Sequence, residues 1–183
     1  MTNLFKSIFA VLLVAVTFTV SAQKKAITVV SKENIKVSKA EAFDLLRNFE
    51  RFPEWSPFIL EDPNQKNHVT GEVGEVGSVF HWEGVAEKSL GTQTLAEAKS
   101  GDYLRMECNI TKPFKGQPVF EYQINETESG VEVVQNFELR CSRFSYFMMK
   151  LFGAKKDITE TNKLGLARLK TLLESETEAT TSN

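Results

Sequence analysis

The sequence contains few cysteines and histidines, and it carries almost no net charge. Its 183 residues include two Cys and two His, and its formal net charge at pH 7 is −2. A slightly acidic chain lacks the positive field of a nucleic-acid-binding domain, so we predict no nucleic-acid partner. His68, His81 and the two Cys residues do not have the spacing of zinc ligands, and nucleotide and redox motifs are missing. We therefore expect no metal and no cofactor.

The two cysteines do not predict a disulfide. Cys108 and Cys141 fall on predicted strands that are separated by one further strand. Two strand spacings amount to about 9.5 Å, whereas the Cα atoms of a disulfide lie within about 6.8 Å of each other. We therefore predict two buried free thiols.

The sequence has a single long apolar run, close to its first residue. Lys6 precedes an almost unbroken apolar stretch from Ile8 to Val20, and Val20-Ser21-Ala22 matches a small-residue cleavage site. This pattern predicts a signal peptide over residues 1–22 and an exported protein, either periplasmic or extracellular. Because the run is shorter than the roughly 20 residues that span a bilayer, an uncleaved N-terminal membrane anchor is the weaker alternative.

The chain after this run alternates between apolar and polar residues. Ala26 to Val37 predicts a first strand, and Ser38 to Glu41 match a capping box that begins a helix ending before Pro53. The glycines at 71, 74 and 77 predict a turn, because no Gly-Lys-Ser/Thr follows as it would in a phosphate loop. Five further strands are predicted at residues 78–86, 89–98, 102–111, 117–126 and 131–141.

The last part of the chain predicts one long helix from Phe144 to Glu174. Apolar residues recur along one face, with a pause at Gly153, so the helix lies on another element. A long amphipathic helix after a meander of strands predicts an α+β fold, in which a bent antiparallel sheet wraps around the helix and leaves an apolar space between them. We predict one ligand-binding domain over residues 23–175 and a disordered Glu/Thr/Ser-rich tail at residues 176–183.

Three polar or aromatic residues break the apolar pattern. Gln135 shares the inward phase of Val133 and Phe137, so it either bonds a neighbouring backbone group or meets a polar group of a bound molecule. Asn162 lies near the apolar face of the helix, where it points into the space or lies on the helix surface. Trp55 is flanked by prolines, and we interpret it as a core plug rather than a ligand contact.

Several motifs together resemble the START-like or SRPBCC superfamily, especially its polyketide cyclase/dehydrase-type branch. They are Phe52-Pro53-Glu54-Trp55, the glycines Gly74 and Gly77 leading into Trp82, and the run Gly165 to Lys170 in the last helix. The likeness covers about residues 26–174 and implies a helix-grip fold with an apolar cavity. Members of this superfamily bind lipids, sterols, hormones and polyketides, and a minority are enzymes. No catalytic residue common to the family transfers to this chain.

The first functional hypothesis is an exported binding protein for a small apolar or amphipathic, lipid-like molecule held between the sheet and the last helix. Recognition would rest on apolar burial, with a few polar groups that orient the ligand. The lining residues that this hypothesis predicts are Phe80, Trp82, Met106, Phe120, Tyr122, Gln135, Phe137, Asn162 and Leu166.

The second hypothesis is a cyclase, dehydrase or hydrolase that acts on a hydrophobic substrate in the same cavity. Its candidate acid/base residues are His81, Glu83 and Tyr122. Strand alternation directs His81 and Glu83 away from the cavity unless a bulge reverses them. In a third hypothesis, the protein fills the space with its own Phe and Met side chains and acts through its surface.

Apolar residues nearly encircle the helix between Phe144 and Phe152, more than the sheet alone can cover. This segment predicts a cavity lid hinged at Gly153, a dimer contact or a membrane contact, and we favour the lid. The sequence leaves the oligomeric state open.

Overall fold

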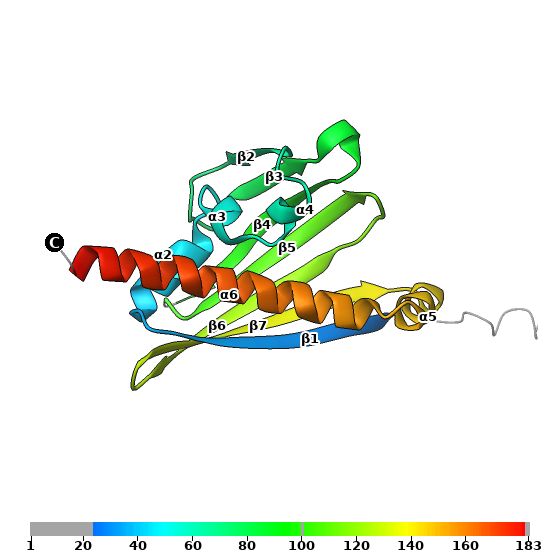
Figure 1. The fold of residues 1–183 in the computed structure, drawn as a ribbon. Helices are drawn as coiled ribbons and strands as arrows, with labels where there is room; N and C mark the ends of the chain where they lie inside the picture. The colour runs from blue at the N-terminus through cyan, green and yellow to red at the C-terminus, as the bar shows by residue number, and fades with distance from the viewer. Residues whose placement is uncertain (1–23, 100, 182–183) are drawn as a thin grey trace, which may run out of the picture.

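The computed structural model describes residues 24–99 and 101–181 (Figure 1). The predicted signal peptide, residues 1–22, lies outside the described residues. The sheet has seven antiparallel strands in the order β1-β7-β6-β5-β4-β3-β2. Their bounds are β1 Lys25–Ile35, β2 Lys66–Thr70, β3 Val79–Glu83, β4 Leu90–Lys99, β5 Tyr103–Lys112, β6 Pro118–Thr127 and β7 Gly130–Cys141.

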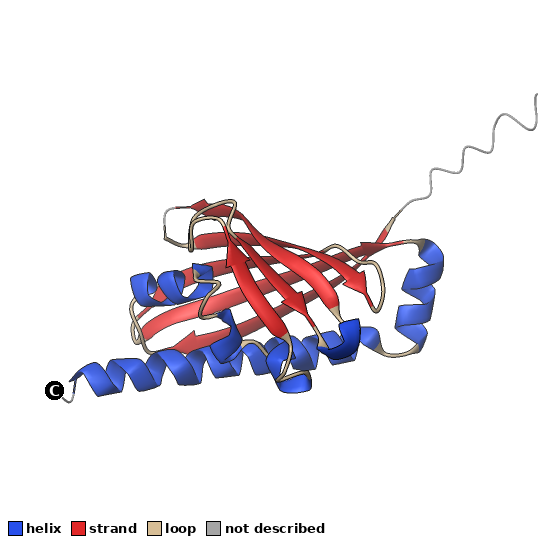
Figure 2. Cartoon of the chain, turned by 90° about the horizontal axis from the view of Figure 1, so that it is seen from above, coloured by secondary structure: helices blue, strands red, loops and turns tan. Residues whose placement is uncertain are grey.

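A long helix, α6 (Ala154–Thr181), crosses one face of this sheet, as Figures 1 and 2 show from two directions. The shorter helices are α2 Lys39–Arg47, α3 Phe52–Trp55, α4 Phe58–Glu61 and α5 Arg143–Leu151, and a 3-10 turn, η1, spans Val85–Glu87. The predicted α+β helix-grip fold is therefore confirmed. We call the face of the sheet that α6 covers the inner face.

The core lies between the inner face and α6. Leu166, Leu169 and Leu173 are buried on one side of α6, where they complete a cluster with the inward residues of the strands. Glu33 of β1 accepts a hydrogen bond from the Lys170 ammonium at 2.9 Å, which ties α6 to the edge of the sheet. The burial of alternate residues on β5, β6 and β7 confirms the predicted strand phase.

The helix that we predicted as one element is in fact two. α5 ends at Leu151, and Gly153 adopts a φ of +75°, which side-chain-bearing residues rarely adopt and which ends the helix. The predicted tail also needs correction, because α6 continues through residues 176–181. Glu and Ala favour helix there, and Glu176 pairs with Arg51, so the end of the helix is held by the segment before α3.

The predicted capping box and the predicted burial of Trp55 are confirmed. The Ser38 hydroxyl accepts from the Glu41 amide, and the Glu41 carboxylate accepts from the Ser38 amide at 2.8 Å, so the capping box begins α2. In α3, Trp55 is buried and lies edge-on to Phe52, with ring centroids 4.9 Å apart. The stretch between α3 and β2 forms the short helix α4 and a turn.

Both cysteines are free, as predicted. Cys108 on β5 is buried, and burial raises the pKa of its thiol to about 12. Cys141 is the last residue of β7 and is only partly buried, so the predicted burial is wrong for this residue. The end of a strand at the end of the sheet has no neighbour that covers it fully.

Candidate functional site

A small cavity remains between α6 and the inner face of the sheet. Its volume is about 20 Å³, which is room for about one water molecule. Residues of α3, α4, three strands and α6 form its wall, namely Phe52, Trp55, Pro57, Phe58, Gln93, Phe120, Tyr122, Gln135, Thr161, Asn162 and Gly165. The space that the sequence predicts as a ligand cavity is thus almost filled by the protein's own side chains, which agrees with the third hypothesis.

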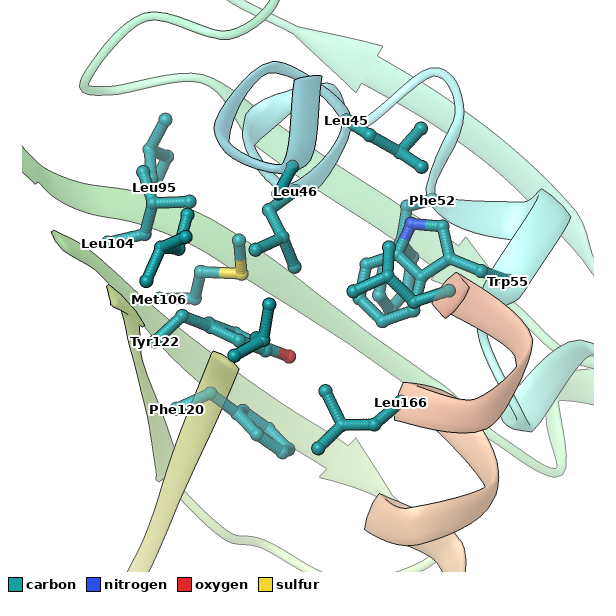
Figure 3. Packing of buried hydrophobic residues seen from close by; sticks show 14 of the residues in the cluster. Leu45, Leu46, Phe52, Trp55, Leu95, Leu104, Met106, Phe120, Tyr122 and Leu166 are labelled. Atoms are coloured by element: carbon teal, nitrogen blue, oxygen red, sulfur yellow. The ribbon is translucent and has the colours of Figure 1, made fainter. Parts of the chain in front are cut away.

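Aromatic and aliphatic side chains do most of this filling. Phe120 and Phe137 are cross-strand neighbours, and their ring centroids lie 5.2 Å apart at 69°. Figure 3 shows Phe120 and Leu166 pointing toward each other across the gap between sheet and helix, with the Tyr122 hydroxyl directed into the same space.

The predicted lining residues fall into two groups. Phe120, Tyr122, Gln135 and Asn162 line the cavity itself. The others belong to the core around it, where Phe80, Met106, Phe137 and Leu166 are buried and Trp82 is partly buried.

A row of polar residues crosses the inner face beside this cavity. Ser31 on β1, Gln135 on β7 and Tyr122 on β6 are opposite one another in the strand register, so their side chains share one face. The Gln135 amide donates a hydrogen bond from Nε2 to the Tyr122 hydroxyl at 2.8 Å. A second buried amide, Gln93 on β4, accepts a hydrogen bond from the Cys108 thiol at 3.4 Å. The core of this domain therefore contains buried polar side chains on β1, β4, β6 and β7.

Our sequence reasoning missed two of these buried polar residues. Ser31 shares the inward phase of Ile27 and Val29, and Gln93 shares that of Leu95. The alternation that identified Gln135 would have found both. The wall formed by α3 and α4 has no such periodicity, so its contribution to the cavity had no signal in the sequence.

Three polar atoms of the cavity wall have no hydrogen-bond partner within the described protein. They are Gln135 Oε1, Asn162 Nδ2 and Trp55 Nε1, on residues that are 4%, 5% and 2% exposed. Leaving a buried polar group unpaired costs about 1–3 kcal/mol. The residues of the cavity wall therefore carry one unpaired acceptor and two unpaired donors.

Among the described residues that line the cavity, Tyr122 is the one side chain that ionises near or above neutral pH. Burial raises the pKa of its hydroxyl, and the hydrogen bond from Gln135 offsets only part of that rise. Tyr122 therefore stays protonated at neutral pH, where it can donate or accept a hydrogen bond but cannot act as a base. No Asp, Glu, Lys, Arg or His belongs to the described wall.

His81 and Glu83 do not reach this cavity. The His81 ring stacks on His68 with centroids 4.3 Å apart, and Nε2 lies 2.9 Å from the Thr70 hydroxyl. Partial burial and the nearby His68 lower the pKa of His81. Glu83 pairs with Lys66 at 3.6 Å. The enzymatic hypothesis therefore loses two of its three candidates, because β3 keeps regular alternation through this stretch.

The outer face of the sheet carries a larger hollow of about 670 Å³. At its centre the Arg105 guanidinium pairs with Glu121 at 2.7 Å and with Glu107 at 3.0 Å. These charges satisfy one another, and the hollow is open and polar, so it offers less to a ligand than the inner cavity. Within residues 24–99 and 101–181, no group of three or more His, Cys, Asp and Glu could hold a metal ion.

The segment from α3 to α4 separates the cavity from solvent. Phe58 lines the cavity and is also 45% exposed, so the wall is thinnest there. The Arg168 guanidinium of α6 donates hydrogen bonds to the backbone carbonyls of Trp55 and Glu54 at 3.1 and 3.0 Å. A Cβ atom on Gly165 would lie 3.2 Å from Pro57 Cδ. The absence of a side chain at Gly165 therefore allows the α3–α4 segment, rather than the sheet, to approach α6 closely.

The predicted lid, α5, lines no part of this cavity. It contributes Met149 to the edge of the core, and the cover over the cavity is the α3–α4 segment instead. The reason is the break at Gly153, which turns α5 away from the line of α6 (Figure 2).

A family model described as polyketide cyclase / dehydrase and lipid transport matches residues 26–174. A protein of unknown function from Staphylococcus aureus has a similar structure, with a TM-score of 0.65 and 14% sequence identity over 85% of this chain and 98% of the other. Ara h 8.0201 matches with a TM-score of 0.61 and 11% sequence identity, over 82% of this chain and 99% of the other. A third similar structure is a norcoclaurine synthase point mutant from Thalictrum flavum in complex with a transition-state analogue. Its TM-score is 0.63 and its sequence identity is 8%, over 85% of this chain and 98% of the other. No curated protein matches the sequence. At these identities the structural matches show the fold alone.

Proposed function

The chain belongs to the polyketide cyclase, dehydrase and lipid-transport family, and we propose that it is an exported protein that binds a small amphipathic, lipid-like molecule between its sheet and α6. The signal-peptide pattern of residues 1–22 supports export. The ligand places an apolar body in the core and one polar group beside Gln135 and Asn162.

The observation that carries this proposal is the set of unpaired polar atoms in the cavity wall. One acceptor, Gln135 Oε1, and two donors, Asn162 Nδ2 and Trp55 Nε1, belong to residues that line a small space with mostly apolar walls. A hydroxyl group satisfies both kinds of atom, because it can donate to Gln135 and accept from Asn162. The same space has room for about one water, and exchange of a water for a ligand hydroxyl or carbonyl conserves hydrogen bonds.

The described wall also sets the charge of the ligand. Without a charged side chain in the wall, a carboxylate or ammonium would be buried with no counter-ion, which costs far more than burying a neutral polar group. The site therefore favours a neutral amphipathic molecule over a fatty-acid anion or an amine.

Binding requires the cavity to open, because drug-sized ligands occupy about 300–1,000 Å³. The α3–α4 segment is the part that moves, since Phe58 already reaches from the cavity to solvent. Exposing Phe52 and Trp55 costs about 1.5–3 kcal/mol each. A ligand that buries ten methylene groups gains about 8 kcal/mol, so apolar burial outweighs the cost of opening.

The alternative function, a cyclase, dehydrase or hydrolase, retains one supporting observation. The Tyr122 hydroxyl faces the cavity and stays protonated, so it can donate a hydrogen bond or a proton to a substrate oxygen. The described wall provides no base to complete acid–base chemistry, and for this reason binding is the better supported function.

The first experiment is to purify the protein from a host that exports it and to extract it with organic solvent. Mass spectrometry of the extract is expected to show a neutral apolar compound in stoichiometric amount. The intact mass of the protein gives its N-terminus and tests cleavage after residue 22. A blank extract, combined with no binding of the neutral apolar fluorophore Nile red, would overturn the proposal.

Two variants locate the site. Phe120→Asp places a charge in the cavity wall and is expected to abolish Nile red binding. Val119→Asp changes the preceding residue of β6, on the outer face, and is expected to leave binding intact. Thr161→Phe adds bulk to the cavity wall without adding charge, which separates loss of the site from loss of the fold. Circular dichroism checks folding, and equal binding by wild type and the Thr161 variant contradicts this location.

A further inference from the structure

Helix α5 presents an unusual apolar surface to solvent. Phe144, Phe147, Leu151 and Phe152, which we call the α5 patch, are 73%, 60%, 65% and 73% exposed. The first three follow an i, i+3, i+7 spacing and form one stripe, while Met149 on another side of the helix packs against the core. Four large apolar side chains exposed together on one helix and its end indicate an interaction surface rather than scattered exposure.

The strand register brings further apolar residues to this end of the sheet. Pro118 at the start of β6 is opposite Leu139 near the end of β7, so the β5–β6 loop lies at the end of the sheet from which α5 leaves. That loop carries Phe114, which is also exposed. The patch therefore belongs to one apolar end of the molecule, on the right in Figure 1.

Basic residues outnumber acidic ones around the α5 patch. Residues 139–156 contain five Lys and Arg residues and no Asp or Glu, although the whole chain has a net charge of −2. Two of the five are paired with flanking carboxylates, Arg140 with Glu138 and Lys156 with Glu160. Arg143 and Lys150 lie within α5, and Lys155 and Lys156 open α6, all of them exposed. Apolar side chains surrounded by positive charge complement the surface of an anionic lipid bilayer.

The beginning of the domain lies at the same place. Lys25, the first residue of β1, is opposite Cys141, the residue from which the chain enters α5.

We propose that the α5 patch docks this domain on an anionic lipid bilayer, with its Phe and Leu side chains in the interface and the neighbouring Lys and Arg at the headgroups. No helix among the described residues is long and apolar enough to cross a membrane. A second copy of the chain fits the patch less well, because pairing two patches brings their positive charges together. The proposal does not depend on whether the inner cavity takes a ligand.

Tryptophan reporters in the exported protein test this directly, whichever N-terminus the protein carries. Phe147→Trp places the reporter in the patch, and Val76→Trp places it on the β2–β3 turn at the opposite end of the sheet, at a site of similar exposure. Vesicles of phosphatidylcholine with and without phosphatidylglycerol are added, and the wild-type emission is subtracted. We expect a blue shift and quenching by brominated lipid at position 147 and neither at position 76.

Charge and apolar contact are then separated by substitution. Phe144→Asp is expected to weaken partition onto mixed vesicles about tenfold or more. The double variant Lys150→Gln with Lys155→Gln is expected to lower partition onto mixed vesicles about fivefold per lysine. It is expected to leave partition onto vesicles of phosphatidylcholine alone unchanged. A reporter at 147 that stays as exposed to water as the one at 76 overturns the proposal. A blue shift that needs no vesicles and grows with protein concentration also overturns it and assigns the patch to self-association.

Discussion

Replacing Asn162 by leucine is expected to stabilise the protein and weaken ligand binding together. The two side chains have the same branched shape, so the substitution changes polarity more than form. Asn162 is buried on α6, its Nδ2 has no partner within the described protein, and it lines the cavity. The substitution removes the donor that we assign to the ligand and leaves the fold otherwise unaltered.

The magnitude follows from the unpaired amide. Removing a buried unsatisfied donor recovers about 1–3 kcal/mol, and leucine is a better helix former than asparagine by a few tenths of a kcal/mol. The two methyl groups of leucine must fit beside a cavity of about 20 Å³, and the resulting strain offsets part of this gain in stability. We expect the free energy of unfolding to rise by about 1–2 kcal/mol, and Tm to rise by about 2–4 °C per kcal/mol. Loss of one hydrogen bond of about 1.4 kcal/mol weakens binding about tenfold.

Urea denaturation of solvent-extracted protein measures the first quantity, because a bound ligand would add its own stabilisation. Titration with Nile red, whose carbonyl can accept from Asn162, measures the second. Lys163→Leu is the matched control, since it changes the next residue of α6, which is exposed, and is expected to alter neither value by much. A loss of more than about 1 kcal/mol in the Asn162 variant would show that the amide is paired in the folded protein. A stabilised variant with unchanged affinity would remove Asn162 from the site.

Three further outcomes are expected. Gly91→Ala should destabilise the protein by about 1–3 kcal/mol in urea denaturation, because its Cβ would lie 2.3 Å from Trp82 Cζ2; unchanged stability would contradict this packing. Cys108, whose pKa is raised to about 12, should resist alkylation at pH 8 in the folded protein and react in urea, with mass spectrometry locating the label. Hydrogen bonds from Ser38 lower the pKa of Glu41, so the carboxylate's contribution to stability is complete above about pH 4.5 and is lost as pH falls through the lowered pKa. Glu41→Gln should therefore reduce the loss of stability between pH 5 and pH 3. An unaltered pH profile of stability would refute the linkage.

The periodicity of apolar residues predicted the elements that have one solvent-exposed face and one buried face. On β5, β6 and β7 the inward residues alternate with polar ones, and the predicted bounds agree with the structure to within one residue at each end. The pattern worked there because burial of one face forces a two-residue period. It worked less well for α5, where the apolar residues encircle the helix and the period carries little information about which side is covered.

The volume of the cavity could not be predicted in this way. Phe120 and Leu166 have the correct phase to line a cavity and equally to fill one, and the difference depends on rotamers and on how the rings interlock. The α3–α4 cover was also out of reach, because Trp55 and Phe58 belong to short helices set by proline positions rather than by a repeating pattern. What the sequence did show was polarity in an inward phase, at Gln135.

That polarity is the strongest reason to regard the space under α6 as a site and not only as a core. A core that contributes stability alone gains nothing from an unpaired Gln135 oxygen and an unpaired Asn162 amide, each of which costs about 1–3 kcal/mol when buried. Apolar residues of similar shape remove that cost, so the unpaired atoms are most easily understood if another molecule supplies the missing partners. In the function that we propose, α6 and the sheet are the fixed walls of this site, and the α3–α4 segment is the wall that moves.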